Sequence, residues 1–198
     1  PMPKPAVPAS EPKPAAVATA KALPDSLKNL PAASGWGDLK VRFAYDGSAP
    51  SPAPVLVTKD QEFCGKFGLV NESLVVNPEN QGIKNVVASL YRGTDKTPMP
   101  IHESYLSHAL DEVLLDNDKC RFEPRVALLW TTQSLLIKNS DAVGHNTKIE
   151  VIANPAINDI VPAGATLLRQ FPQTERSPAA PVACSIHPWM NAWLVVRD

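Results

Sequence analysis

The segment CSIHPWM at residues 184–190 places three potential metal ligands, Cys184, His187 and Met190, at intervals of three residues. A second imidazole, His145, lies upstream in the segment NSDAVGHN. A soft thiolate suits Cu(I), imidazole suits both oxidation states of copper, and a long axial bond to methionine tunes the reduction potential. These four side chains therefore indicate a site for one copper ion that transfers electrons.

Other kinds of metal site fit these residues less well. Structural zinc favours more thiolates or a third histidine over a methionine. A dinuclear copper site needs a second thiol in the same loop, which Ser185 and Ile186 do not supply. A catalytic copper site needs further histidines, and only His102 and His108 remain, six residues apart in an irregular segment where we expect surface positions. We therefore do not expect an enzyme.

The two other cysteines, Cys64 and Cys120, form an even pair once Cys184 is assigned to the metal. A disulfide between them would close a long loop and stabilise the fold by about 4 kcal/mol on the chain-entropy model. It would also require an oxidising compartment. The alternative is two unrelated buried thiols in a cytosolic protein.

Composition and charge limit the class of protein. The chain has 198 residues, of which 44% are hydrophobic and 20% charged, and its net charge is −1. Near-zero net charge disfavours nucleic acid or an anionic membrane as a partner. No apolar run approaches the ~18 residues of a membrane-spanning helix. Because the chain begins at Pro1, we expect that a leader has been removed and that the protein is periplasmic or extracellular.

The organisation changes near residue 37. Residues 1–36 are rich in proline and alanine, which predicts an extended arm or linker that could dock on a partner. Residues 37–198 read as one domain with many short strands, frequent turns and no long helical period, which predicts an all-β sandwich. The expected strands are 39–45, 55–57, 74–76, 83–91, 126–130, 134–139, 147–152, 166–171 and 192–196, with 126–130 and 134–139 as a hairpin and a short helix near 102–110.

The ligand segment resembles the cupredoxins, the small blue copper proteins. Its spacing, with Pro188 following the second histidine, is most similar to the amicyanins, and the segment around His145 is similar to plastocyanin-like members. The resemblance covers about residues 120–198 well. Residues 38–120 match loosely, closer to longer cupredoxin-like proteins of bacterial envelopes that carry a paired cysteine before the copper half.

This resemblance implies a Greek-key β-sandwich with an enlarged N-terminal half and an insertion around 61–120. It implies Cys184, His145 and His187 as equatorial ligands and Met190 as the axial ligand. It also implies that Asn146 ties the two ligand segments together by hydrogen bonds and that Pro188 stiffens the loop. Longer relatives lead us to expect a histidine near Arg125, where this chain has an arginine suited to a structural ion pair.

The resulting functional prediction is extracytoplasmic electron transfer through a mononuclear type 1 copper site. The partner would be a redox protein such as a cytochrome or a multi-subunit complex. The edge of His187 is expected to reach solvent, with Pro188 and Trp189 as an apolar contact patch, although Trp189 could equally cap the end of the sandwich; Trp130 and Trp193 are expected in the core. The alternative is a structural subunit of a larger extracytoplasmic complex built on a cupredoxin scaffold.

Overall fold

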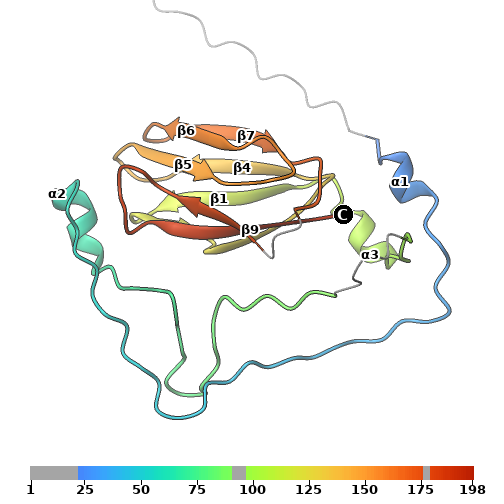
Figure 1. Ribbon diagram of the computed structural model, residues 1–198, viewed down its shortest axis with the longest axis horizontal. Coiled ribbons are helices and arrows are strands. Elements are labelled where there is room, and N and C mark those ends of the chain that lie inside the picture. Colours follow the sequence, from blue (N-terminus) through green and yellow to red (C-terminus); the bar gives the residue numbers. More distant parts are fainter. Residues whose placement is uncertain (1–21, 91–96, 176–178) are drawn as a thin grey trace, which may run out of the picture.

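Two β-sheets stacked face to face form the body of the protein (Figure 1). The structure is a computed structural model that describes residues 22–90, 97–175 and 179–198. The four-stranded sheet has the order β2-β1-β4-β7 and the five-stranded sheet the order β3-β9-β8-β5-β6. The first sheet comprises β1 (Glu112–Asp118), β2 (Arg121–Glu123), β4 (Ser134–Asn139) and β7 (Thr166–Gln170). The second comprises β3 (Val126–Trp130), β5 (His145–Ile149), β6 (Ile157–Val161), β8 (Ala180–Ala183) and β9 (Asn191–Arg197).

Most neighbouring strands are antiparallel, but two pairs are parallel, β1 with β4 and β3 with β9. Successive side chains of a strand point to opposite faces of its sheet, so every second side chain lies between the two sheets. In β3, for example, Ala127 and Leu129 are buried while Leu128 is 56% exposed. The largest fully buried apolar side chains are Phe122, Phe171, Leu115, Leu129, Leu135, Ile137, Ile149, Met190 and Leu194. The predicted all-β sandwich is confirmed by this arrangement.

The described residues before β1 lie outside both sheets. They hold α1 (Asp25–Lys28), α2 (Gln61–Cys64), the 3₁₀ turn η1 (Gly65–Phe67) and α3 (Glu103–Leu106). Much of the chain between α1 and β1 lies apart from the two sheets as extended backbone, and we call this part the N-terminal excursion (Figure 1). Its helix α2 lies at one end of the sandwich and α3 toward the other. Its pairing consists of the isolated bridges Ala44–Gly82, Pro54–Val70 and Val76–Ile83.

Several strand predictions for this half are wrong. Residues 39–45, 55–57, 74–76 and 83–90 form no strand of either sheet, and residue 91 lies outside the described part. Alternating apolar residues favour a strand only where a neighbouring strand covers one face. Here several apolar side chains are open to solvent, with Leu39 86% and Leu90 74% exposed, although Val55 and Val57 pack against the core of the sandwich and Val76 is buried.

The hairpin predicted from 126–130 and 134–139 is also wrong. Both segments are strands, but β3 pairs with β9 and β4 pairs with β1 and β7, so the turn between them crosses from one sheet to the other. The predicted short helix is confirmed in a shorter form, as α3. The arm boundary at residue 36 stays a prediction, since residues 1–21 lie outside the described part.

One buried carboxylate organises the turn between β5 and β6. Glu175, 1% exposed, accepts hydrogen bonds from the backbone N–H groups of Ile152, Ala153 and Asn154 at 2.9–3.2 Å. Burial raises the pKa of Glu175, but these bonds outweigh burial and lower the pKa from its ordinary value of 4.5. The turn is therefore held by an ionised side chain.

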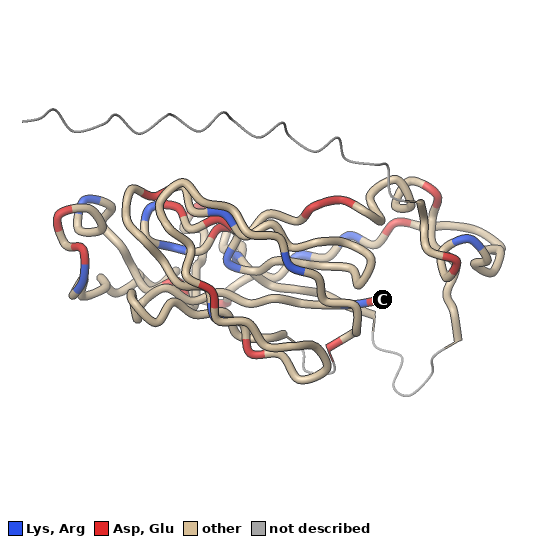
Figure 2. The backbone as a smooth tube through the Cα atoms, turned by 90° about the horizontal axis from the view of Figure 1, so that it is seen from above, with Lys and Arg blue, Asp and Glu red and all other residues tan. Residues whose placement is uncertain are grey.

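Lys and Arg residues are interspersed with Asp and Glu residues along the described part of the backbone (Figure 2). The charge distribution thus does not single out a face for a highly charged partner. Among the described residues, no helix is both long and apolar enough to cross a bilayer.

Candidate metal centre

The loop between β8 and β9 carries three of the predicted ligands and is closed by its own backbone. The N–H of Cys184 donates to the carbonyl of Met190 at 3.2 Å, and the N–H of Met190 donates to the carbonyl of His187 at 2.9 Å. Cys184, His187 and Met190 are 3%, 0% and 1% exposed, whereas Pro188 is exposed. The loop thus holds these three side chains inside the end of the sandwich.

Asn146 joins this loop to β5. Its backbone N–H donates to Cys184 Sγ at 3.3 Å, and its side-chain oxygen accepts the N–H of Ser185 at 3.0 Å. Its side-chain amide donates to Asn158 and Asp159 of β6. Because Asn146 follows His145 in β5, these bonds fix the distance between His145 and the thiol. His145 is the first residue of this strand rather than part of a preceding loop.

Three buried donor atoms converge between the two segments. Nδ1 of His145 lies 3.0 Å from Nδ1 of His187, and Cys184 Sγ lies 3.7 Å from Nδ1 of His187. Ligand atoms of all three residues lie within 4.8 Å of one another. The imidazoles face each other with ring centroids 4.6 Å apart. The spacing is that of donors arranged around one small cation.

Each imidazole is oriented from behind by a carboxylate. Nε2 of His145 lies 2.8 Å from Oδ2 of Asp141, and Nε2 of His187 lies 2.7 Å from Oδ2 of Asp60. A carboxylate accepts a hydrogen bond, so each Nε2 carries the proton. In the neutral ring Nδ1 is then left with a bare lone pair. Two buried lone pairs that face each other at 3.0 Å need a cation or an added proton between them.

Asp141 also supports the turn between β1 and β2. Its carboxylate accepts the N–H of Lys119 at 2.6 Å and the N–H of Cys120 at 2.8 Å. Both turn residues have positive φ, 53° and 56°, as the central residues of a tight hairpin turn require. Neither residue is glycine, so the two bonds stabilise a backbone conformation that is otherwise unfavourable. One buried carboxylate therefore fixes both this turn and His145.

Electrostatics favour a charged pair in the metal-free site. Burial raises the pKa of the Cys184 thiol, but hydrogen bonds from His145, the N–H of Asn146 and His187 outweigh burial and bring that pKa to about 6. Burial also lowers the pKa of His145, whereas Asp141 and Cys184 raise it to about 9. At neutral pH the result is a thiolate beside an imidazolium. Metal binding would replace that proton.

The disulfide between Cys64 and Cys120 is confirmed, with a Cα–Cα distance of 5.6 Å. A second group of possible ligands, Cys120, Asp141 and His145, lies nearby. It offers no thiolate because Cys120 is oxidised. Among the described residues at this end of the sandwich, Cys184 is thus the free buried thiol.

The structure brings His145, Cys184 and His187 together, with the Met190 side chain buried in the same loop. Their service as metal ligands stays a prediction. The spare histidines are elsewhere: His102 precedes α3 and contacts Trp36, and exposed His108 pairs with Asp111.

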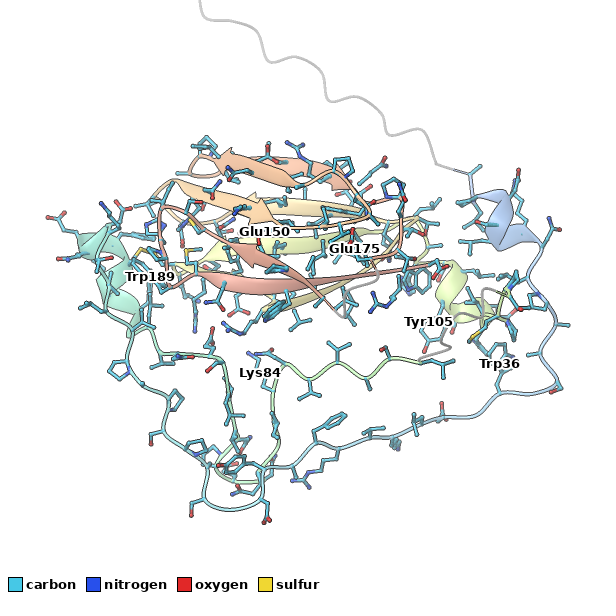
Figure 3. All side chains as sticks on the ribbon, in the orientation of Figure 1. Trp36, Lys84, Tyr105, Glu150, Glu175 and Trp189 are labelled. Carbon is cyan, nitrogen blue, oxygen red and sulfur yellow. A yellow bond between two sulfur atoms is a disulfide. The ribbon has the colours of Figure 1, made fainter. Side chains whose placement is uncertain are left out.

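Four expectations about the surroundings have clear outcomes. The expected solvent-facing edge of His187 is wrong, because Asp60 covers it. Trp189 is half-buried and lies at the end of the sandwich beside α2 (Figure 3). Its ring is tilted against that of His187, with centroids 5.2 Å apart, and its Nε1–H donates to the Cys120 carbonyl at 3.1 Å. Trp193, expected in the core, is 44% exposed on the outer face of β9. Arg125 bonds to Asn191 and lies 3.9 Å from Glu72, as expected for a structural arginine.

Sequence reasoning missed both carboxylates. Asp141 lies four residues before His145, and this spacing was the available signal. Asp60 is 127 residues from His187 and follows no recognisable pattern, so only the fold could reveal it.

Comparison with known proteins gives a partial likeness. No protein-family model matches the chain, and no curated protein matches it. Solved structures of amicyanin align with a part of it. A reduced Cu(I) form of an amicyanin mutant is 18% identical, with a TM-score of 0.38, over 43% of this chain and 82% of that chain. Amicyanin from Paracoccus versutus is 13% identical, with a TM-score of 0.38, over 43% of this chain and 81% of that chain. The Cu(I) of the first of these structures belongs to that amicyanin.

Proposed function

We propose that this chain is a copper protein that transfers electrons outside the cytoplasm and is not itself an enzyme. One copper ion would be held by Nδ1 of His145, Nδ1 of His187 and Sγ of Cys184, with Met190 as a weak axial ligand. In this proposal the sandwich is cupredoxin-like. The single observation that carries the proposal is the convergence of Nδ1 of His145, Nδ1 of His187 and Sγ of Cys184 in a buried space.

The donor set favours copper over other metals. Two imidazoles, one thiolate and a long methionine bond are typical of blue-copper electron-transfer sites. Zinc sites with one thiolate and two imidazoles take a third nitrogen or oxygen ligand instead, and the loop offers a thioether at Met190. The metal would supply a one-electron couple between Cu(I) and Cu(II).

The protein's own residues would keep the site rigid and dry. Asn146 fixes the Cys184 sulfur, and the backbone bonds of the loop hold His187 and Met190 in place. Asp141 and Asp60 orient the two imidazoles. A ligand set that is already arranged before the metal binds changes little when the charge of the metal changes, and this favours rapid electron exchange.

The compartment and the partner belong to the same proposal. The Cys64–Cys120 disulfide favours the periplasm or the cell exterior, because thiols in the cytosol are kept reduced. A redox partner such as a cytochrome would need only a small contact area. With the edge of His187 covered by Asp60, half-buried Trp189 and exposed Pro188 are the candidates for that contact.

The test is copper titration of the purified metal-free protein. We expect one equivalent of Cu(II) to produce an intense visible band from thiolate-to-copper charge transfer, which a mild reductant abolishes and reoxidation restores. Cys184→Ser should abolish the band. His108→Gln, which changes an exposed histidine far from the site, should leave it intact. Absence of the band from the unmodified protein, or its survival in Cys184→Ser, would contradict the proposal.

A second candidate function is a structural subunit of a larger extracytoplasmic complex. The observation that favours it is the exposed apolar side chains of the N-terminal excursion, Trp36, Leu39, Leu56 and Leu90, which are 58–86% exposed. Residues 1–36 would extend the same docking region. Size-exclusion chromatography with light scattering of native material tests this function. A mass well above 21.3 kDa that falls after Leu39→Asp and Leu90→Asp supports the structural function. A monomeric mass for both the unmodified protein and the variant excludes this function.

A further inference from the structure

Asp60 reaches the candidate metal centre from a segment outside the sandwich. Its carboxylate lies 2.7 Å from Nε2 of His187, although the two residues are 127 positions apart. His187 is fully buried, while the Asp60 side chain is 41% exposed. The outer edge of the imidazole therefore contacts a carboxylate that itself faces water.

This contact is specific rather than a by-product of helix capping. Asp60 occupies the N-cap of α2, where an aspartate ordinarily accepts a backbone N–H of the first turn. Within α2, which is described in full, the side chain makes no such bond. The backbone of Asp60 supplies the carbonyl that accepts the N–H groups of Phe63 and Cys64. The carboxylate is left free for His187.

Covalent and apolar contacts hold Asp60 in place. Four residues later, Cys64 is fully buried and bonded to Cys120. Phe63 and Phe67 pack against the core of the sandwich and against each other, with ring centroids 5.2 Å apart. The segment that carries Asp60, which lies with α2 at one end of the sandwich (Figure 1), is thus attached at several points.

The disulfide also connects the two carboxylates. Cys120 donates its N–H to Asp141, the partner of His145, while Cys64 belongs to the helix that Asp60 begins. The disulfide thus links the segment that holds Asp60 to the turn that is bonded to Asp141, and these two carboxylates contact the two imidazoles. Both rings are held in the same orientation, with Nε2 directed to a carboxylate and Nδ1 directed inward.

From this geometry we propose that Asp60 is a positioning residue for His187 that favours Cu(II) over Cu(I) at the candidate centre. This inference rests on the proposed copper function. A carboxylate behind a metal-bound imidazole fixes the ring and increases its basicity. The negative charge, together with the stronger donor, stabilises the more highly charged oxidation state. Because the Asp60 side chain is 41% exposed, a docking protein could reach this residue from water.

The test compares Asp60→Ala, Asp60→Asn and the control Glu62→Gln. Glu62 is an exposed carboxylate on the same helix, so its loss changes net charge by the same amount without touching His187. For Asp60→Ala we expect Cu(II) to bind about 10- to 100-fold more weakly, with a smaller loss for Cu(I). A tenfold change in the ratio of the two affinities raises the reduction potential by about 59 mV. The copper affinities and reduction potential of Asp60→Asn should lie between those of the unmodified protein and Asp60→Ala, and those of Glu62→Gln should match the unmodified protein.

A second readout needs no copper. Nitrogen NMR of the metal-free protein should show His187 protonated at Nε2, and Asp60→Ala should shift this ring toward a mixture of tautomers. If the potential, the visible band and the tautomer of Asp60→Ala all match those of Glu62→Gln, the positioning role is overturned. If the unmodified protein lacks the thiolate band, the copper function fails, and the tautomer measurement still decides whether Asp60 orients His187.

Discussion

Replacing Asp141 with asparagine should lower the free energy of unfolding of the metal-free protein. The loss should exceed that of the same carboxylate-to-amide substitution at any other residue at this end of the sandwich. The carboxylate accepts three N–H groups, from Lys119, Cys120 and His145, at 2.6–2.8 Å, and it is only 4% exposed. An asparagine has one oxygen, and its amide group is a donor. Whichever way the side chain turns, at least one buried donor then faces another donor.

The size of the effect follows from these contacts. A buried donor left without an acceptor costs about 1–3 kcal/mol, and the remaining bonds weaken from the charged range of about 1.5–3 to the neutral range of about 0.5–1.5 kcal/mol each. We therefore expect Asp141→Asn to lower the free energy of unfolding by about 3–5 kcal/mol, a large part of the stability of an ordinary domain.

Urea unfolding of the metal-free protein at neutral pH measures this change. Asp118→Asn is the matched control, since this carboxylate lies at the end of β1, beside the turn that Asp141 supports, is 40% exposed and pairs with Lys119 at 3.6 Å. An exposed pair of this kind contributes about 0–1 kcal/mol. If the two variants unfold at the same urea concentration with the same slope, the assigned role of Asp141 is refuted.

Three further predictions concern other contacts. Glu175→Gln should cost about 2–3 kcal/mol at neutral pH. Because the pKa of Glu175 is lowered by folding, its contribution is present above its ordinary value of 4.5 and is lost as the pH falls through the folded pKa, so the variant and the unmodified protein should converge in acid unfolding. Replacing Cys64 and Cys120 together with alanine should cost about 4 kcal/mol from the released loop of 56 residues, measured by thermal unfolding, and an unchanged melting temperature would contradict this. Asn146→Ala keeps the backbone N–H that bonds to Cys184 Sγ but loses the side-chain bond to Ser185 that holds this N–H against the sulfur, so the pKa of Cys184 should rise above about 6; the pH dependence of thiol alkylation in the metal-free protein measures it, and an unchanged profile would count against the role of the Asn146 side chain.

The sequence predicted the candidate ligands because they are chemically distinctive and closely spaced. Cys184, His187 and Met190 share one loop, and a sandwich brings the segment of His145 beside that loop. The disulfide followed from counting the remaining cysteines. These predictions depended on residue type and number, which a single sequence states directly.

The N-terminal half could not be predicted in the same way. Alternating apolar residues such as those at 39–45 favour a strand, but a strand forms only if another segment pairs with it, and here the pairing is limited to isolated bridges. Conversely, β1 is hard to recognise, because its sequence EVLLDND does not alternate between apolar and polar residues. Its burial does not alternate strictly either, since residues 115–117 are all buried. The contact of Asp60 with His187 depends on how α2 folds back, which no local pattern encodes.

The most direct test is a crystal structure of the copper-loaded protein with anomalous scattering recorded at the copper edge. We predict one strong peak between Nδ1 of His145, Nδ1 of His187 and Sγ of Cys184, with both Nε2 atoms still bonded to Asp141 and Asp60. A copper peak bound elsewhere, for example at the exposed His108, with the three buried donors unchanged, would contradict the proposed centre.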